Sequence, residues 1–359
     1  MIIVFTSNEK GALVQMAIKV TEVIKELGLP VKCYIPNNAS TSIPLDIEAS
    51  IVRYSKTKSP NPYNIGAITV ARKILNENAK LVFAVDNGTF TSQIGIILGR
   101  KVPMGLVMHD AGTSHSSYKN GIRQMLKKRI EKLTSEVCNN RIDWIITCSQ
   151  SSQDTYNKLY PKHKDKNLLL PLGPHMPDGN LVPVEVNDCD DYLLFFGHID
   201  RYKGLINLLR AFSKWDGKRK LVVAGSGQLQ PEESEIAQND DRVVLINRFI
   251  KDEEMKYLFL HSRAIVLPYI EATQSGVLPI AYMCSKPVIC SNVIGISQFV
   301  NNNETGYICS NDFDYIKAFS LIESNDTISF LAKQARLYYE AHLDWVKNIK
   351  MLLQQIGIK

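Results

Sequence analysis

Residues 264–288 read AIVLPYIEATQSGVLPIAYMCSKPV. The run 264–267 is typical of a buried strand, and the apolar stretch 276–284 is typical of a buried helix. The turn between them holds four polar side chains: Glu271, Thr273, Gln274 and Ser275. In an α/β sheet, a strand, a polar turn and a helix present ligand-binding groups at the carboxyl end of the strand. Helix capping explains one hydroxyl group here but not Glu271, so we favour a binding site over a cap alone.

The same alternation of short apolar runs and helical stretches continues on both sides of this segment. It begins with the strand pattern MIIVFTS at 1–7 and restarts with YLLFFGHI at 192–199. Residues 171–191 lie between the two series, are rich in Pro, Gly and Asp, and lack periodicity, which indicates a linker. Strands that alternate with helices predict βαβ units and parallel sheets. We therefore predict two doubly wound, Rossmann-like α/β domains that face a cleft, where small ligands usually bind.

Bulk composition is that of a globular chain. It has 359 residues, 45% hydrophobic and 22% charged, enough for two apolar cores. The N-terminus reads as a strand rather than a signal peptide, and no apolar run reaches the ~18–20 residues that a membrane helix needs. The seven cysteines are scattered without paired spacing, so we expect reduced thiols and a cytoplasmic protein rather than disulfides or a zinc site.

The net charge of +6 is modest, but residues 123–132, RQMLKKRIEK, concentrate positive charge within a helical pattern. One interpretation is a solvated helix face. The other is a surface that meets anionic lipid or a phosphorylated substrate, at the inner face of the cell membrane. We expect no nucleic-acid partner, because no aromatic residues interleave with the basic ones.

Two further loops follow predicted strands in the second half. The loop GHIDRYKGL at 197–205 places Gly197, Arg201 and Lys203 just before a helix that starts near Leu205. Cations beside a helix N-terminus suit a diphosphate, although a surface loop with stray charges is the alternative. The loop AGSGQL at 224–229 has Gly225, which allows close backbone approach or a tight turn. We expect these loops and the amide groups of Ser275 and Gly276 to converge at the cleft.

Taken in order, the stretches LLFFGHIDRYKGLINLLRAF, LVVAGSGQL, VVLINRFI and LPYIEATQSGVLPIAYMCSKPVI resemble the family 4 glycosyltransferases, which have the two-domain GT-B fold. The resemblance covers most of residues 190–310, whereas the first half is similar only through its strand pattern and VMHD at 107–110. It implies an N-terminal acceptor domain over 1–172 and a nucleotide-sugar donor domain over 173–340. It also implies that the terminal helix, 341–359, crosses back onto the first domain.

The resemblance assigns roles to the residues of the donor site. Lys203, with Arg201, Gly197 and Gly225, corresponds to the diphosphate site, although the family's usual arginine position holds His198. Glu271 resembles the acidic residue that contacts the donor sugar. The turn 273–276 corresponds to a phosphate-holding turn, and the segment Arg248, Phe249 and Ile250 resembles the part that packs on the nucleobase.

Two other positions bear on activity. His109 of VMHD resembles the histidine near the anomeric centre, and a capping or core histidine is the alternative. The family's second acidic residue, which usually binds the ribose hydroxyls, falls on Ile280, and Pro279 is no substitute. The absence of this acidic residue does not remove the diphosphate site. The family pattern does not, however, identify the groups that contact the ribose, nor does it fix which position corresponds exactly to Glu271.

The resemblance implies a retaining glycosyltransferase that moves a sugar from a nucleoside-diphosphate sugar to a glycan or lipid-linked acceptor, as in bacterial surface-polysaccharide synthesis. Its catalytic residues would be His109, Glu271 and Lys203, with no metal and no cofactor. Helix N-termini and cations would stabilise the leaving diphosphate. The alternatives are an inactive GT-B subunit that binds a nucleotide sugar or a partner transferase, and another GT-B enzyme such as an epimerase or phosphorylase.

Overall fold

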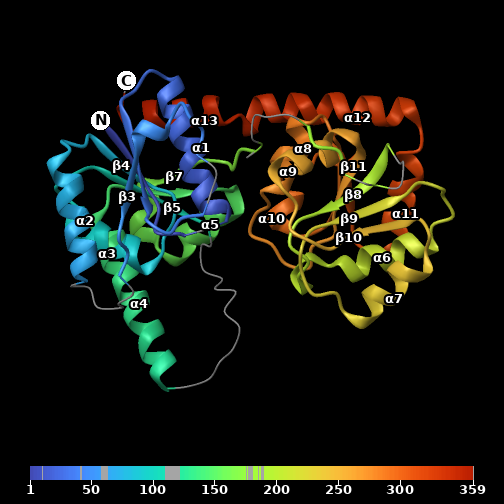
Figure 1. The fold of residues 1–359 in the computed structure, drawn as a ribbon, viewed down its shortest axis with the longest axis horizontal. Helices are drawn as coiled ribbons and strands as arrows, with labels where there is room; N and C mark the ends of the chain where they lie inside the picture. The colour runs from blue at the N-terminus through green and yellow to red at the C-terminus, as the bar shows by residue number, and fades with distance from the viewer. Residues whose placement is uncertain are drawn as a thin grey trace. The chain divides into compact units, whose positions relative to one another are not determined.

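The computed structural model describes residues 1–9, 11–40, 43–57, 64–109, 122–174, 176, 181–184, 186 and 190–358, and in the helix that starts at Ile122 it describes side chains from Arg129 onward. The chain divides into two compact units (Figure 1). Unit 1 comprises Met1–Pro171 and Trp345–Lys359, and unit 2 comprises Leu172–Asp344. Each unit is a parallel β-sheet covered by helices, which confirms the prediction of two doubly wound α/β domains.

Unit 1 contains a seven-stranded parallel sheet with the order β3-β2-β1-β4-β5-β6-β7. Its strands are β1 (Ile2–Phe5), β2 (Val31–Pro36), β3 (Ile51–Tyr54), β4 (Leu81–Ala84), β5 (Met104–Met108), β6 (Trp144–Thr147) and β7 (Asn167–Leu169). Its helices are α1 (Ala12–Glu26), η1 (Glu48–Ser50), α2 (Ile65–Asn76), α3 (Thr89–Leu98), α4 (Ile122–Arg141), α5 (Gln150–Leu159), η2 (Pro161–Lys166) and α13 (Trp345–Gln355).

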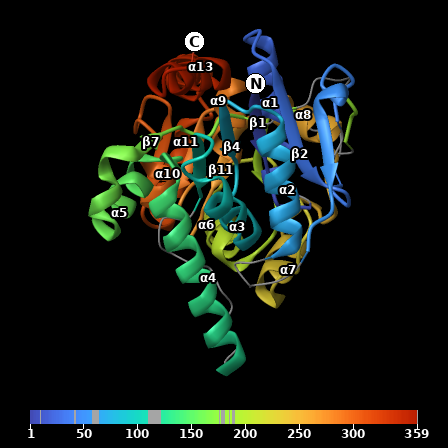
Figure 2. The same cartoon turned by 90° about the vertical axis from the view of Figure 1, so that its left-hand side faces the viewer.

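Helices α13 and α4 stand out in unit 1. Although α13 is the last helix of the chain, it packs against α1, and it buries Trp345, Ile349, Leu352 and Leu353. Helix α4 is 20 residues long. It packs on α3, and its N-terminal half projects away from the sheet (Figure 2).

Unit 2 contains a six-stranded parallel sheet with the order β10-β9-β8-β11-β12-β13. Its strands are β8 (Tyr192–Phe196), β9 (Leu221–Ala224), β10 (Val243–Ile246), β11 (Ser262–Leu267), β12 (Val288–Ser291) and β13 (Gly306–Cys309). Its helices are η3 (Arg201–Lys203), α6 (Leu205–Lys214), α7 (Pro231–Asn239), α8 (Asp252–His261), α9 (Val277–Met283), α10 (Ile294–Ser297), α11 (Asp312–Leu321), α12 (Asn325–Tyr338) and η4 (Tyr339–Leu343).

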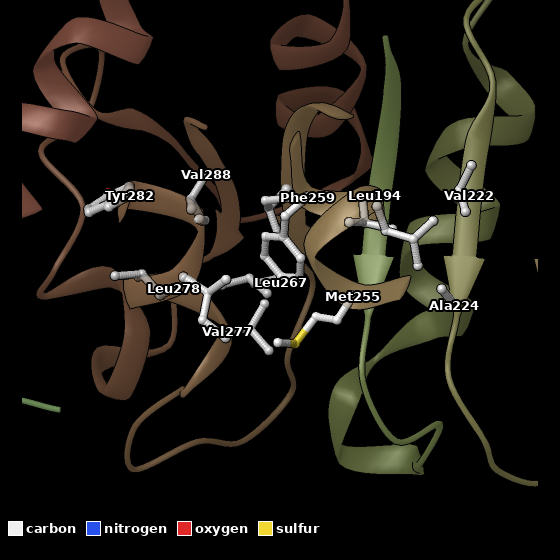
Figure 3. Close-up of a cluster of buried hydrophobic side chains, with 14 of the residues drawn as sticks. Leu194, Val222, Ala224, Met255, Phe259, Leu267, Val277, Leu278, Tyr282 and Val288 are labelled. Carbon is white, nitrogen blue, oxygen red and sulfur yellow. The ribbon is translucent and has the colours of Figure 1, made fainter. Parts of the chain in front are cut away.

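The sheet of unit 2 has an apolar core on each face, because successive side chains of a strand point to opposite faces. On one face, Leu194 of β8, Phe259 of α8 and Leu278 and Tyr282 of α9 belong to the same apolar core, in which Leu194 lies beside Phe259 (Figure 3). Its neighbours Leu193 and Phe195 pack with α6 and α11 on the other. Strands that are buried on both faces are continuously apolar, which is why YLLFF and AIVL could be recognised in the sequence.

The strand order of each sheet reverses at one point. In unit 1 the reversal lies between β1 and β4, and in unit 2 between β8 and β11. Loops that leave the carboxyl ends of strands on either side of such a point flank a crevice, which is where ligands bind in open α/β sheets. In unit 2 these loops are 197–204 and 268–276, two of the segments singled out in the sequence.

The described part of the chain contains no helix that combines the length and the apolar character needed to cross a bilayer. The six cysteines among the described residues are free thiols, and all but Cys284 are buried.

Candidate functional site

Three loops of unit 2 meet at the carboxyl edge of its sheet. β8 pairs with β9 so that Phe196 lies opposite Ala224, and the pairing continues past the strand ends. The amide of Gly197 donates to the Ala224 carbonyl at 3.0 Å, and Ile199 forms an isolated bridge with Gly227. Gly225 has φ 151°, and a Cβ there would clash with the Gly197 carbonyl. The glycine at this position thus permits the close approach of the loops 197–205 and 224–229.

The loop after β8 also packs on the loop after β11. Gly204 adopts the left-handed conformation, with φ 68°, and a Cβ there would clash with the carbonyl oxygen of Pro268. The amide of Ile270 donates to the Tyr202 carbonyl at 2.8 Å. Arg201 is exposed at the start of η3, and α6 begins at Leu205, as predicted from the sequence.

Lys203 lies where these two loops touch and is only 9% exposed. Its ammonium group donates a hydrogen bond to the hydroxyl of Tyr269 and lies 4.1 Å from the centre of that ring. The Nζ atom of Lys203 also lies close to Gly197, because it is 3.6 Å from the position that a Cβ atom on Gly197 would occupy. Among the described residues, Lys203 forms no salt bridge. A buried cation whose neighbours are neutral groups suits an anionic ligand, because its charge is not yet compensated.

The polar turn 271–276 leads into α9. Ser275 is buried, and its hydroxyl accepts a hydrogen bond from the amide of Val277 at 3.2 Å and lies 3.4 Å from the Tyr269 hydroxyl. Capping therefore accounts for part of what Ser275 does. Glu271 and Gly276 are exposed, whereas Thr273 and Gln274 are half-buried. The turn thus leads from Tyr269, which contacts Lys203, into α9, and it carries an exposed carboxylate at Glu271.

The segment after β10 is held by an ion pair. The guanidinium group of Arg248 forms two hydrogen bonds of 2.8 Å with the carboxylate of Glu254, in the first turn of α8. The hydrogen bonds from Arg248 hold the pKa of Glu254 below its ordinary value. Phe249 is 75% exposed, whereas Ile250 packs in the apolar core. Phe249 is therefore the side chain of this segment that is open to a flat ligand such as a nucleobase.

Ile280 is buried in α9 and packs in the core of unit 2, and Pro279 is buried beside it. A carboxylate at position 280 would enter this apolar core as an uncompensated charge, which is costly. The packing of α9 is thus consistent with an apolar residue at the position where the resembled family has its second acidic residue.

In unit 1, His109 follows β5, and its Nε2 atom forms a hydrogen bond of 2.8 Å with the Val85 carbonyl. The preceding residues of VMHD form the end of β5, and Asp110 lies outside the described residues. The basic segment 123–132 belongs to α4, where Arg129 and Lys132 are exposed, while the side chains of 122–128 lie outside the description.

Asp86, which was not predicted as a functional residue from the sequence, organises the carboxyl edge of the unit 1 sheet between β1 and β4. Its buried carboxylate accepts hydrogen bonds from the hydroxyls of Thr6 (2.8 Å), Ser7 (2.9 Å) and Thr91 (2.6 Å). It also accepts from the amides of Ser7 (2.6 Å) and Gly88 (3.0 Å). The signal was present as an aspartate directly after the apolar run LVFAV, followed by Asn-Gly.

A second residue that was not predicted from the sequence is Tyr269, which contacts both Lys203 and Ser275.

The described residues contain no group of three or more His, Cys, Asp and Glu side chains that could hold a metal ion.

Comparisons with known proteins bear on the fold and on the part of unit 2 that contains these loops. A family model described as "Glycosyl transferases group 1" matches residues 190–322, which contain all three loops of the unit 2 site. An uncharacterized glycosyltransferase of Methanocaldococcus jannaschii is 25% identical over 178 residues, which is 45% of this chain and 45% of that protein. The match therefore spans just under half the length of the curated relative.

Solved structures match over almost the whole chain. HepE of Anabaena, determined in complex with UDP, is similar with a TM-score of 0.74 and 13% identity, covering 99% of both chains. Sucrose-phosphate synthase from Thermosynechococcus elongatus is similar with a TM-score of 0.71 and 17% identity, covering 99% of this chain and 98% of that one. A glycosyltransferase from Rickettsia africae has a TM-score of 0.71 and 16% identity, over 99% and 97% of the two chains. The chain has the GT-B fold, and the family match within unit 2 supports a glycosyltransferase.

Proposed function

We propose that the chain transfers a sugar from a nucleoside-diphosphate sugar to a glycan or lipid-linked acceptor, with the donor bound by unit 2. The observation that carries this proposal is Lys203. It is a nearly buried cation at the carboxyl edge of the sheet, its partners are the neutral hydroxyl and ring of Tyr269, and it forms no salt bridge among the described residues. A diphosphate supplies the missing negative charge.

Other groups near Lys203 suit the same ligand. Arg201 is exposed at the start of η3, the turn that also contains Lys203, and the first amides of α6 follow Gly204. The first amide groups of a helix lack carbonyl partners within the helix, so they and the helix dipole favour an anion. As the bond to the sugar breaks, negative charge grows on the departing diphosphate, and these groups are already in place to stabilise it. Phe249 offers an exposed ring for the nucleobase.

For the transfer itself we propose retention of anomeric configuration, as in the family 4 enzymes that the sequence resembles. The acceptor hydroxyl then attacks from the side of the departing diphosphate, and a diphosphate oxygen takes its proton. Glu271 orients the donor sugar, and by the same resemblance His109 is the histidine that acts near the anomeric centre. Positive charge on Lys203 and Arg201 takes the place that a metal ion holds in other transferases, so neither metal nor cofactor is needed.

UDP is the first nucleotide to test, because crystal structures of HepE of Anabaena were determined with UDP, with UDP and glucose, and with UDP-glucose. A thermal-shift screen of UDP, GDP and their common sugar conjugates tests donor binding directly. A ligand at 100 times its dissociation constant adds ~2.7 kcal/mol to the free energy of unfolding, a shift that is readily measured. If none of these ligands raises the melting temperature, the proposed donor site is wrong.

For the acceptor we propose a surface-polysaccharide intermediate that is carried on lipid, and for the protein a peripheral place on the cytoplasmic face of the membrane. The support is α4, where Ile130, Leu133 and Val137 are 39%, 53% and 46% exposed on one helix face, beside the exposed cations Arg129 and Lys132. An apolar stripe flanked by cations suits an anionic lipid surface. Sedimentation with vesicles that contain phosphatidylglycerol, but not with pure phosphatidylcholine vesicles, is the expected result.

The second candidate is a GT-B subunit that binds a nucleotide sugar without transferring it. The observation that favours this binding subunit is Ile280 of α9. It packs in the apolar core of unit 2 at the position where the family has its second acidic residue. Both candidates bind a donor, but only the enzyme releases nucleoside diphosphate from it. Release measured over hours, with and without a mixture of lipid-linked acceptors, separates them.

A further inference from the structure

Tyr269 is the second residue after β11, and its side chain is only 2% exposed. Its position is fixed from several sides. The carbonyl of Tyr269 accepts a hydrogen bond from the Ser291 hydroxyl at 2.5 Å. Its ring packs edge-on against that of Tyr202, with 6.3 Å between the centroids and 79° between the planes. The hydroxyl of Tyr269 is therefore held at one place, between the two loops of the proposed donor site.

That hydroxyl meets one polar group from each loop. It accepts a hydrogen bond from the ammonium group of Lys203, which follows β8, and it lies 3.4 Å from the Ser275 hydroxyl, which precedes α9. The ring adds a second attraction, because its face lies 4.1 Å from the same ammonium group. Tyr269 thus joins Lys203 and Ser275 into one buried chain of three polar groups.

We propose that Tyr269 is a positioning residue that holds Lys203 and Ser275 together in the conformation that receives the donor diphosphate. The proposal rests on the donor site described above. A free lysine side chain has many rotamers, and ordering it on binding reduces affinity. Tyr269 orders it beforehand. A carboxylate at this place would also order Lys203, but it would neutralise the ammonium group and compete with phosphate, whereas a phenol leaves the full charge to the ligand.

Tyr282 is the control residue, because its buried hydroxyl forms hydrogen bonds that stabilise the fold but lie outside the proposed donor site. It is buried in the same core, and its hydroxyl bonds to the Phe299 carbonyl at 3.2 Å and to the Thr305 hydroxyl at 2.8 Å. Neither partner belongs to the loops 197–205, 224–229 or 268–276. Tyr282→Phe therefore removes a buried hydroxyl at similar cost to the fold, without touching Lys203 or Ser275.

The test is isothermal titration of the full chain with UDP and with GDP. Tyr269→Phe keeps the ring and loses the hydroxyl, so we expect the dissociation constant of the nucleotide that binds to rise about 3- to 10-fold. Tyr269→Leu loses the ring as well, and we expect a rise of roughly 10- to 50-fold. Tyr282→Phe should lower the melting temperature yet change the dissociation constant less than about two-fold, within the usual effect of a remote substitution.

A double-mutant cycle with Lys203→Met distinguishes positioning from general loss of structure. If Tyr269 acts through Lys203, adding Tyr269→Phe to Lys203→Met changes affinity much less than it does in the wild type. An equal loss of affinity in both backgrounds, or no loss in either, overturns the role of Tyr269 and leaves the donor site standing. If the wild type binds neither UDP nor GDP, the donor site fails, and the role of Tyr269 fails with it.

Discussion

The ammonium group of Lys203 lies 4.1 Å from the centre of the Tyr269 ring, although 66 positions separate the two residues in the chain. They meet because β8 and β11 are neighbours at the point where the strand order of the unit 2 sheet reverses. The buried cation is thereby held by neutral groups at the edge of the sheet where ligands bind in this class of fold. The proposed donor site depends on this arrangement.

Asp86 should be essential for the stability of unit 1. Asp86→Asn keeps the shape of the side chain but removes the charge that accepts from Thr6, Ser7, Gly88 and Thr91. Hydrogen bonds to a charged group contribute ~1.5–3 kcal/mol each, so we expect the free energy of unfolding to fall by at least about 2 kcal/mol in urea titrations. The exposed Asp200→Asn is the matched control and should unfold like the wild type. Equal stability of the two variants would show that the Asp86 network is dispensable.

The terminal helix α13 should stabilise unit 1, because it packs on α1. Ile349→Ala removes a side chain that is buried in this contact, and we expect a loss of ~2–5 kcal/mol in the free energy of unfolding. Met351→Ala, on the exposed side of the same helix, should change stability by no more than ~0.5 kcal/mol. Deleting 345–359 should lower the melting temperature further than Ile349→Ala does. Unchanged melting after the deletion would contradict this role of the helix.

How much of this could be predicted from the sequence depended on the range of the interactions. Apolar runs followed by glycine or proline placed the loops 197–205, 224–229 and 268–276 at strand ends, because strand periodicity and turn chemistry are local. The start of α6 at Leu205 was predicted for the same reason.

Side-chain partners from distant segments could not be predicted in this way. The contact of Lys203 with Tyr269, and the grouping of Thr6 and Ser7 around Asp86, depend on which strands are neighbours and in what register. Arg248 was assigned to the nucleobase segment by resemblance, and its ion pair with Glu254 appeared only in the structure. The missing acid at Ile280 was visible in the sequence, but not the packing of that residue in the core.

His163 should make stability depend on pH. Burial, with Lys166 and Lys162 nearby, lowers the pKa of His163, and its ring bonds to the Tyr156 hydroxyl at 3.0 Å and the Asn140 side chain at 2.9 Å. The unfolded chain has the ordinary pKa of ~6.5, so it binds the proton more readily than the folded protein does. Its stabilising contribution is therefore complete above pH ~6.5 and is lost as the pH falls through the lower folded value.

This dependence can be measured from melting temperatures between pH 7.5 and pH 5. His163→Gln does not titrate, so its melting temperature should fall less over this range than that of the wild type. His198→Gln, at an exposed position, is the control and should follow the wild type. If the His163 variant and the wild type lose stability in parallel, His163 is not the titrating group.

Transfer should survive removal of metal ions. The positive charge of the proposed site comes from Lys203, Arg201 and helix amides. We therefore expect the protein to retain most of its transfer activity after treatment with EDTA. The measurement compares nucleoside diphosphate release before treatment, after EDTA, and after Mg²⁺ or Mn²⁺ is added back. Activity that is abolished by EDTA and restored by either ion would contradict the proposed electrostatics.

Lys203 provides the most direct test of the central claim, that unit 2 binds and activates a nucleotide sugar. The measurement is the rate at which nucleoside diphosphate is released from a panel of UDP- and GDP-sugars, with ion-pair chromatography used to quantify the product. Charge-assisted hydrogen bonds of ~1.5–3 kcal/mol predict that Lys203→Ala lowers kcat/KM about 10- to 150-fold. Lys214→Ala, which removes an exposed lysine of α6 that pairs with Asp312, should leave the rate unchanged. We predict equal release by the wild type and by Lys214→Ala, and release by Lys203→Ala that is slower by at least about 10-fold. Equal rates in wild type and Lys203→Ala, or no release from any donor by the wild type, would contradict the account.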